Sequence, residues 1–274
     1  MIEIYYYSGT GFTLNAAKLF ANELKEEVRL VPMLGAFNSG LTESEAENVG
    51  LFMPMHAGTI PLFCKKFLEN FKFTRAKYIF SLITSGGAST KIHKDIDHLL
   101  KKQKKNLAAY QFVVTPNTFD PVFKVPLDEK TLRERDNIGQ DIKNFAGVVS
   151  DRKHEIRLKY RNRIVENFVF PLVKLINHAT DYFWLQNCFC ANDKCIGCGK
   201  CETLCLSGKI KMKDGRPLWQ KDVSCQYCLA CLHFCPVEAV QISSKKDLPP
   251  GRIFCKDIST KELRAQKEYV REEV

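Results

Sequence analysis

Residues 195–205 read CIGCGKCETLC, and residues 225–236 read CQYCLACLHFCP. Each stretch spaces four cysteines as CxxCxxCxxxC, and the second stretch repeats the first 30 positions further along the chain. Three cysteines that are two residues apart wrap one loop around a cubane-shaped iron-sulfide core and supply three of its four ligands. The fourth ligand must then come from another part of the chain.

Zinc is the competing interpretation of these cysteines. It takes four nitrogen or sulfur ligands and favours paired CxxC knuckles, which the repeated CxxCxxCxxxC spacing fits poorly. Residues 188–244 instead resemble the bacterial-type two-[4Fe-4S] ferredoxin domain, in which the last cysteine of each run ligates the other cluster. Leu206 departs from the proline usual after that cysteine, whereas Pro236 keeps it. The resemblance implies one cluster on Cys195, Cys198, Cys201 and Cys235, and a second cluster on Cys225, Cys228, Cys231 and Cys205.

The cysteine-rich region reads as an internal duplication beyond its cysteines. Ile210 and Met212 fall at the same offsets as Val240 and Ile242, so we expect each half to close with a strand. The four remaining cysteines are expected to be ordinary buried or free thiols: Cys64, Cys188, Cys190 and Cys255.

The first part of the chain alternates strand-like and helix-like apolar patterns. Five runs rich in Ile, Val, Tyr and Phe, separated mainly by helical segments, predict a doubly wound, five-stranded parallel α/β sheet with helices on both faces. The runs are IEIYYY, VRLVPML, NVGLFMP, KYIFSLIT and LAAYQFVVT. We expect four regions, namely a first domain at 1–123, a helical connecting region at 124–187, the cysteine-rich domain at 188–244, and a tail at 245–274. Ser259 and Glu262, in capping-box spacing, predict a surface helix in the tail.

The SGTGFT loop lies between the first strand and the first helix, where backbone N–H groups and a helix N-terminus favour an anion. It has neither the GK[ST] of a Walker A loop nor a GxGxxG turn, and its hydroxyl groups suit the phosphate of FMN. The loop resembles the phosphate loop of flavodoxin, with Phe12 in place of the usual Asn. The implied phosphate-binding residues are Ser8, Gly9, Thr10, Gly11, Phe12 and Thr13.

Two further loops, PMHAGTIP at 54–61 and TSGGAS at 84–89, follow the third and fourth strands. The carboxyl ends of parallel strands meet at one edge, where ligands of open α/β sheets bind. In flavodoxin-like domains such loops flank the isoalloxazine ring, and here His56 stands where an aromatic residue is expected, while residues 115–119 after the last strand help to close the site. The resemblance adds these FMN-binding residues: Pro54, Met55, His56, Ala57, Gly58, Thr84, Ser85, Gly86 and Gly87.

Taken together, the chain resembles the flavodoxin-ferredoxin fusions known as ferrodoxins of the EFR family. This resemblance implies FMN, two [4Fe-4S] clusters and one-electron transfer between them. Two alternatives stay open. The first is an FMN-dependent reductase of a small substrate, fed by its clusters, with His56 as a proton donor. The second is a redox-sensing module that lacks FMN.

The formal net charge of +10 raises the question of an acidic partner. The basic excess gathers in residues 65–105, which end in KKQKK, and reads either as a solvated helix face or as a docking surface for acidic redox carriers. Nucleic acid is not expected, because aromatic residues are not interleaved with the basic ones. The absence of a secretory signal before MIEIYYY and of a long apolar run predicts a cytoplasmic protein with no membrane span.

Overall fold

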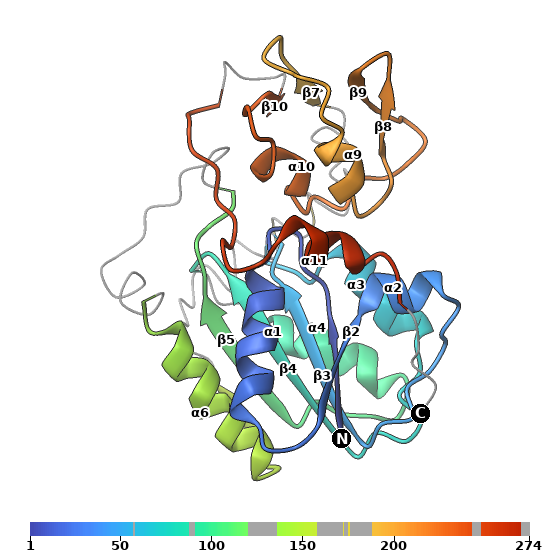
Figure 1. The fold of residues 1–274 in the computed structure, drawn as a ribbon. Helices are drawn as coiled ribbons and strands as arrows, with labels where there is room; N and C mark the ends of the chain where they lie inside the picture. The colour runs from blue at the N-terminus through green and yellow to red at the C-terminus, as the bar shows by residue number, and fades with distance from the viewer. Residues whose placement is uncertain are drawn as a thin grey trace.

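The computed structural model describes residues 1–56, 58–87, 91–119, 136–157, 188–242 and 248–269, together with residues 172 and 175. Within these residues, a large parallel sheet with helices on both faces forms the lower part of the molecule in Figure 1. The cysteine-rich elements form a smaller part above its carboxyl edge.

The large sheet has the strand order β2-β1-β3-β4-β5-β6, and all its pairings are parallel. The order of the first five strands is the doubly wound flavodoxin-like order, with its switch point between β1 and β3. The strands are β1 (Ile2–Tyr6), β2 (Val28–Pro32), β3 (Asn48–Pro54), β4 (Tyr78–Ser85), β5 (Ala109–Val114) and β6 (Glu155–Arg157).

Two features of this layer differ from the sequence-based expectation. The sheet has six strands rather than five, because β6 pairs with β5 in a region expected to be helical. A strand of three residues with one apolar side chain has no periodic pattern that a sequence could show. This strand is defined by its backbone pairing with the edge of β5. The run VRLVPML was read as one strand, but it ends at Pro32, and its last two residues begin helix α2 (Met33–Asn38).

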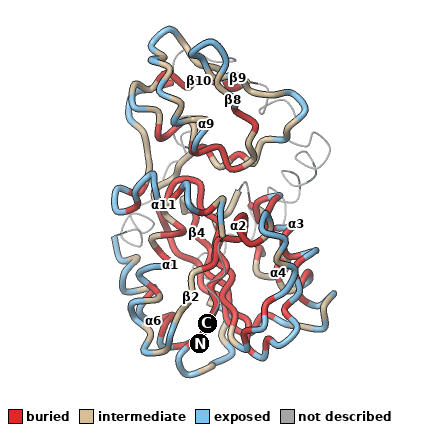
Figure 2. Tube along the Cα trace, turned by 45° about the vertical axis from the view of Figure 1, so that its right-hand side comes forward, coloured by how far each residue is buried: buried red, intermediate tan, exposed pale blue. Residues whose placement is uncertain are grey.

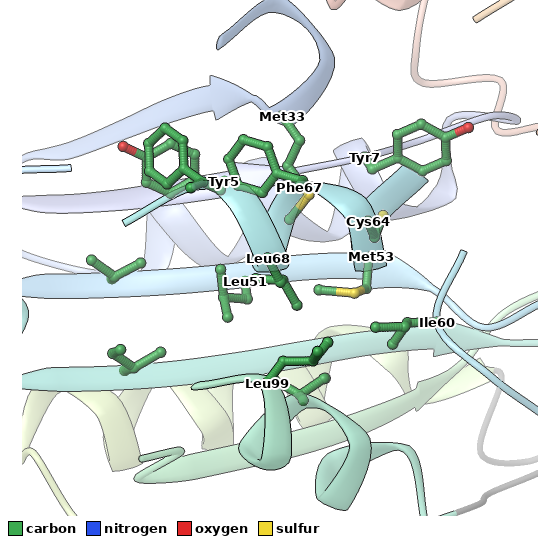
Figure 3. Packing of buried hydrophobic residues seen from close by; sticks show 14 of the residues in the cluster. Tyr5, Tyr7, Met33, Leu51, Met53, Ile60, Cys64, Phe67, Leu68 and Leu99 are labelled. Atoms are coloured by element: carbon green, nitrogen blue, oxygen red, sulfur yellow. The ribbon is translucent and has the colours of Figure 1, made fainter. Parts of the chain in front are cut away.

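The helices cover the two faces of the sheet in two groups. One face carries α1 (Phe12–Glu23) and α6 (Ile138–Ser150), and the other carries α2, α3 (Leu62–Asn70) and α4 (Ile92–Lys101). The strands between them are buried along most of their length (Figure 2). Figure 3 shows the second face, where Leu51 and Met53 of β3 lie beside Leu68 of α3. Burial of these apolar side chains stabilises the layer and so fixes the carboxyl edge.

The cysteine-rich part contains short elements only. Strand β7 (Phe189–Ala191) pairs antiparallel with β10 (Val240–Ile242), and β8 (Ile210–Lys213) pairs antiparallel with β9 (Arg216–Trp219). Helices α9 (Lys200–Leu204) and α10 (Ala230–His233) follow the second cysteine of each run. Strands β8 and β10 contain the residues at which each half was expected to close with a strand.

The chain then returns across the carboxyl edge of the large sheet as residues 253–266, which we call the C-terminal strap. The strap contains helix α11 (Thr260–Ala265), which lies between the two parts of the molecule in Figure 1. In the residues that the structure describes, no helix combines the length and the apolar character needed to cross a bilayer.

Candidate functional site

The eight cysteines of the two runs line two separate cavities in groups of four. The outer cavity is lined by Cys195, Cys198, Cys201 and Cys235, together with apolar residues such as Ile196, Met212 and Val240. The inner cavity is lined by Cys205, Cys225, Cys228 and Cys231, together with Ile210, Trp219 and Leu229. Each group therefore takes three cysteines from one run and one from the other, so each cavity joins the two halves of the duplication.

The duplication is also visible in the backbone. Positive φ angles occur at Gly197, Gly199 and Gly208, and again 30 positions later at Tyr227, Leu229 and Glu238. Gly199 and Leu229 are the N-caps of α9 and α10, which carry the third cysteine of each run. A backbone conformation with positive φ is unfavourable for any residue other than glycine. The second half therefore keeps the same turn at a cost in conformational energy. This turn aims successive cysteines of a run at one cavity.

The cysteine groups surround a space rather than a point. Across the described ranges, no three His, Cys, Asp or Glu side chains converge closely enough to hold a single metal ion. A tetrahedral zinc ion with its short sulfur bonds would need such convergence, whereas each iron of a [4Fe-4S] core takes its own cysteine. Four thiol groups line each cavity, which is the number of cysteine ligands that a [4Fe-4S] core takes.

Burial governs the protonation of these thiols. It raises the pKa of Cys201 and of Cys225 to about 11 and that of Cys228 to about 12. The three thiols are therefore protonated at neutral pH. Backbone N–H groups of Tyr227 and Ala239 donate to the sulfurs of Cys225 and Cys235, at 3.4 and 3.1 Å.

The two cavities differ in their distance from solvent and from the large sheet. Cys198 is exposed, and its neighbour Ile196 is 65% exposed, so the outer cavity lies close to the surface. The inner cavity lies against the first domain, since a Cβ atom built on Gly9 would fall 2.3 Å from the carbonyl oxygen of Cys228. Leu206 and Cys228 also pack on the core of the large sheet.

The four other cysteines stand outside both groups. Cys64 lies on the buried side of α3, and burial raises its pKa well above the usual value. Cys255 is buried on the strap, where its backbone N–H donates to the carbonyl of Thr10 at 2.9 Å. Cys188 and Cys190 precede and occupy β7. None of the four lines either cavity.

The three loops that sequence reasoning selected for FMN do come together at the carboxyl edge. The hydroxyl groups of Thr13 and Thr84 lie 2.8 Å apart, and the N–H of Met55 donates to the carbonyl of Thr84 at 2.8 Å. A Cβ atom on Gly86 would lie 2.6 Å from Cβ of Asn117, so the loop after β5 packs on the loop after β4. Pro54, Thr84 and Ser85 form the ends of strands β3 and β4 rather than loop.

The predicted phosphate loop, residues 8–13, is covered by the chain itself. Gln266 accepts from the N–H of Ser8 at 3.1 Å and donates to the carbonyl of Ser8 at 2.7 Å. A Cβ atom on Gly11 would lie 3.0 Å from Cβ of Cys255 and 3.2 Å from Cβ of Ile258. The hydroxyl of Ser8 accepts from the N–H of Leu14 at 3.3 Å.

The loop in this arrangement does not fit the phosphate of FMN. Ser8, Gly9, Thr10, Gly11 and Thr13 are all buried, with Cys228 and the strap packed against them. A buried anion needs free donors around it, and here a side-chain amide of the same chain already bonds the first residue of the loop. The strap would have to move before this loop could hold a phosphate.

His56 occupies a tight turn after β3. Its backbone N–H and carbonyl bond those of Thr59, both at 2.9 Å. Although part of the residue is exposed, its dense surroundings desolvate the ring and lower its pKa to about 4, so the imidazole is neutral at pH 7. A neutral imidazole is a poor proton donor, which disfavours the donor role considered from the sequence. Ala57 lies outside the described residues, and Gly58 is buried.

The tail helix lies at the surface, as the sequence predicts. The capping box of Ser259 and Glu262 is confirmed at the start of α11. Most residues of the helix are exposed, whereas Leu263 and the C-cap residue Gln266 are buried against the first domain. Sequence reasoning missed Gln266, because a single glutamine in a charged segment carries no pattern that marks it as buried.

The fold and the cysteine groups define a flavodoxin-like α/β domain joined to a cysteine-rich domain with two candidate cluster sites. No protein-family model matches the chain, and no curated protein matches it.

Among solved structures, the chain is similar to the rubredoxin oxygen:oxidoreductase of Desulfovibrio gigas, at 19% identity and a TM-score of 0.34, covering 54% of this chain and 36% of that one. It is also similar to the Trp repressor binding protein of Bacillus subtilis, at 12% identity and a TM-score of 0.33, over 59% and 99% of the two chains. A third is the flavodiiron protein of Giardia intestinalis, at 16% identity and a TM-score of 0.31, over 55% and 37%. The fold assignment rests on the strand order, because these TM-scores are low.

Proposed function

We propose that this chain is an electron-transfer protein that holds two [4Fe-4S] clusters, one in each cysteine-lined cavity. The observation that carries this function is the division of eight cysteines into two groups of four around two cavities. When bound, the clusters would supply one-electron storage at two adjacent sites. Cys195, Cys198, Cys201 and Cys235 would hold the outer cluster, and Cys205, Cys225, Cys228 and Cys231 the inner one.

The surroundings of the two cavities favour the outer site as the place where electrons are exchanged with a partner. The exposed side of the outer cavity, at Ile196 and Cys198, is the surface where a partner protein can approach. The inner cavity is enclosed between the cysteine-rich part and Gly9 of the first domain. Partners would therefore exchange electrons at the outer site, with the inner site as the connection to the large domain.

Acidic redox carriers are the partner class that the charge favours. Lysines on α3, on α4 and in the turns that follow them are mostly exposed, among them Lys65, Lys66, Lys72, Lys94, Lys101 and Lys102. We propose a cytoplasmic, anaerobic setting, because clusters of this kind are held by thiolates that oxidants attack.

Metal analysis of oxygen-free protein tests the function. We expect about eight irons and eight sulfides per chain, as two [4Fe-4S] clusters require. Cys198→Ser and Cys228→Ser should each lose close to half of the iron, and Cys228→Ser should also destabilise the cysteine-rich part, because metal binding there is coupled to folding.

Cys64→Ala is the matched control for those variants. It removes a buried thiol that lies outside both cavities, so its iron content should equal that of the wild type. Zinc in place of iron, or full iron in both serine variants, would exclude the proposed function.

We propose FMN binding only in a state of the protein in which the strap has moved away from the phosphate loop. The position of residues 8–13 after β1, and the meeting of three loops at one edge, support a flavin site there. The measurement is the flavin content of denatured holoprotein, with FMN titrated into wild type and Gln266→Ala. Tighter binding by the variant would support a loop that the strap closes.

The closed loop favours a second candidate function. A redox-sensing module without FMN would use its clusters to report oxidation through the contact between Cys228 and Gly9. Flavin-free holoprotein that fails to pass electrons to any protein carrier, but changes its protease sensitivity on oxidation, would favour the sensor over the carrier.

A further inference from the structure

A cleft of about 450 Å³ opens where the large domain meets the inner cysteine group. One wall comes from the first domain and includes Tyr7 just after β1, Phe37 and Asn38 of α2, and Phe63 of α3. The other wall comes from residues 205–208, Val223, Ser224, Gln226 and Lys267. This volume lies in the range of small-molecule sites, which are found preferentially where domains meet.

Two residues that line the cleft each carry a buried polar atom that has no hydrogen-bond partner among the described residues. The Tyr7 side chain is 1% exposed, and among the described residues its hydroxyl bonds nothing. The side-chain carbonyl of Gln226 is likewise buried and unpartnered. Figure 3 shows the Tyr7 hydroxyl pointing away from the packed core residues. A buried polar group without a hydrogen bond costs free energy, so a ligand that bonds both atoms would be favoured.

The apolar wall of the cleft is aromatic. The rings of Tyr7 and Phe63 stack with centroids 5.6 Å apart, and Phe37 meets Phe63 edge to face at 5.7 Å. Such rings favour a flat conjugated ligand, because aromatic faces and edges pack well on one another. Leu34, Leu206 and Val223 also belong to the apolar lining.

The polar lining limits the charge and chemistry of the ligand. Among the described residues that line the cleft there is one cation, Lys267, and no carboxylate. The Lys267 ammonium is already held by the carbonyl of Thr203 at 2.5 Å. The cleft therefore suits a neutral or singly anionic molecule. The Tyr7 hydroxyl can donate to a carbonyl, and the Gln226 carbonyl can accept from an N–H or O–H group.

We propose that this cleft binds a small planar conjugated molecule that carries a carbonyl beside an N–H or O–H group. That chemistry is shared by aminoquinones and by free heteroaromatic lactam rings. Cys205 lines both the cleft and the inner cavity, so the bound ring would lie beside the inner site. The redox use of the cleft rests on the proposed function, whereas binding itself does not need the phosphate loop.

The test is anaerobic equilibrium dialysis of the holoprotein against two probes. The first is 2-amino-1,4-naphthoquinone, and the second is lumiflavin, a lactam ring without phosphate. At least one probe should bind, and the tighter one identifies the source of the shared chemistry. Tyr7→Phe should weaken its binding about three- to tenfold, as expected for one lost hydrogen bond. The parent 1,4-naphthoquinone, which lacks the N–H group, should bind more weakly than its amino form.

Asn38→Trp supplies a second variant that leaves the inner cysteine loop untouched. Asn38 is exposed on α2 and lines the cleft, so an indole there should fill the space and abolish binding. Ser39→Trp is the matched control, because Ser39 is the exposed next residue and does not line the cleft. It should bind the probe as the wild type does.

Failure of the cleft can be distinguished from failure of the proposed function. Iron content and cluster absorption are measured on each dialysed sample, and their loss would sink the electron-transfer function. With the iron retained, the absence of binding by both probes would overturn the cleft. Probe binding that is unchanged in Asn38→Trp and Tyr7→Phe would also overturn the cleft. The same holds if Thr10→Ala, in the phosphate loop, weakens probe binding more than these two variants do.

Discussion

At the scale of single residues, Gln266 links the two ends of the described chain. Its amide makes a two-way bond with the backbone of Ser8 and also donates to the carbonyl of Leu263 at 2.9 Å. The residue is 1% exposed, so these bonds form away from water. The Gln266 side chain thus bonds the backbone at the start of the loop that was predicted to bind a phosphate.

We predict that Gln266→Ala lowers the free energy of unfolding by about 1–3 kcal/mol, because the polar groups of Ser8 lose their partner in a buried place. Chemical denaturation of the holoprotein measures it. Gln140→Ala, at an exposed position on α6, should change stability by less than about 0.5 kcal/mol. Equal stability of the two variants would contradict the role of Gln266.

Lys209 is a second residue whose place only the folded chain reveals. It lines the inner cavity at 1% exposure, and its ammonium donates to the carbonyls of Gln220 and Val223 at 2.5 and 2.6 Å. A buried cation beside a cluster favours the reduced, more negative state.

We predict that Lys209→Met makes the reduction potential of the proposed inner cluster more negative and leaves that of the proposed outer cluster nearly unchanged. A redox titration followed by electron paramagnetic resonance measures both. Lys211→Met removes an exposed lysine of β8 and should shift neither potential appreciably, because solvent screens its charge. A Lys209→Met protein with both potentials unshifted would show that its charge does not reach the cluster.

At the scale of elements, α11 shows how a short helix is fixed on the domain. Its six residues are too few to form a stable helix alone. The capping box satisfies its first turn, Glu262 pairs with Lys18 of α1 at 2.5 Å, and Leu263 packs on the core. The hydrogen bonds of Lys18 and then Ser259 lower the pKa of Glu262 to about 2.

We predict that Glu262→Ala destabilises the protein by about 1 kcal/mol, chiefly through the lost cap. The folded pKa lies below the unfolded one, so this contribution is complete above about pH 4.5 and is lost only as the pH falls toward 2. The difference from wild type should therefore stay constant from pH 8 to pH 5 in thermal unfolding.

Glu262→Gln separates the cap from the charge in that experiment. A glutamine keeps the capping box but loses the ion pair with Lys18, which is worth little because both side chains are partly exposed. It should lie within about 0.5 kcal/mol of wild type. A Glu262→Ala effect that is as large at pH 3 as at pH 7 would show that the pKa of the carboxylate is not lowered in the folded protein.

At the scale of the whole molecule, the close approach of Gly9 and Cys228 holds the two parts together. We predict that Gly9→Ala separates them or loosens the inner cysteine loop, since its Cβ atom would fall 2.3 Å from a backbone oxygen, and backbone moves less readily than a side chain. The measurement is limited proteolysis of the holoprotein, with its melting temperature.

Gly147→Ala is the matched control for Gly9→Ala. Gly147 lies inside α6, and a Cβ atom there would meet nothing within 4 Å. Alanine should stabilise that helix by about 0.5–1 kcal/mol, because glycine lowers helix stability. A Gly9→Ala protein as stable and as protease-resistant as wild type would mean that the two parts are not packed as described.

The sequence by itself determined the features that repeat or alternate. Apolar runs separated by helical segments specified the five strands of the parallel sheet, because a strand buried on both faces must be apolar throughout. The 30-residue offset of the two cysteine runs showed the duplication, and the capping-box spacing marked the start of α11. The role of the eight cysteines in these runs as cluster ligands stays a prediction.

Tertiary structure alone decided what depends on distant contacts. The sixth strand β6 exists because the edge of β5 was free to pair, and no periodic pattern could show it. The strap closes residues 8–13 because Gln266 and Ile258, far along the chain, return to β1. A sequence can mark a loop as able to bind a phosphate, but whether that loop is open depends on which segment packs on it. This is a property of the whole fold, since burial and hydrogen bonding are set by partners remote in sequence.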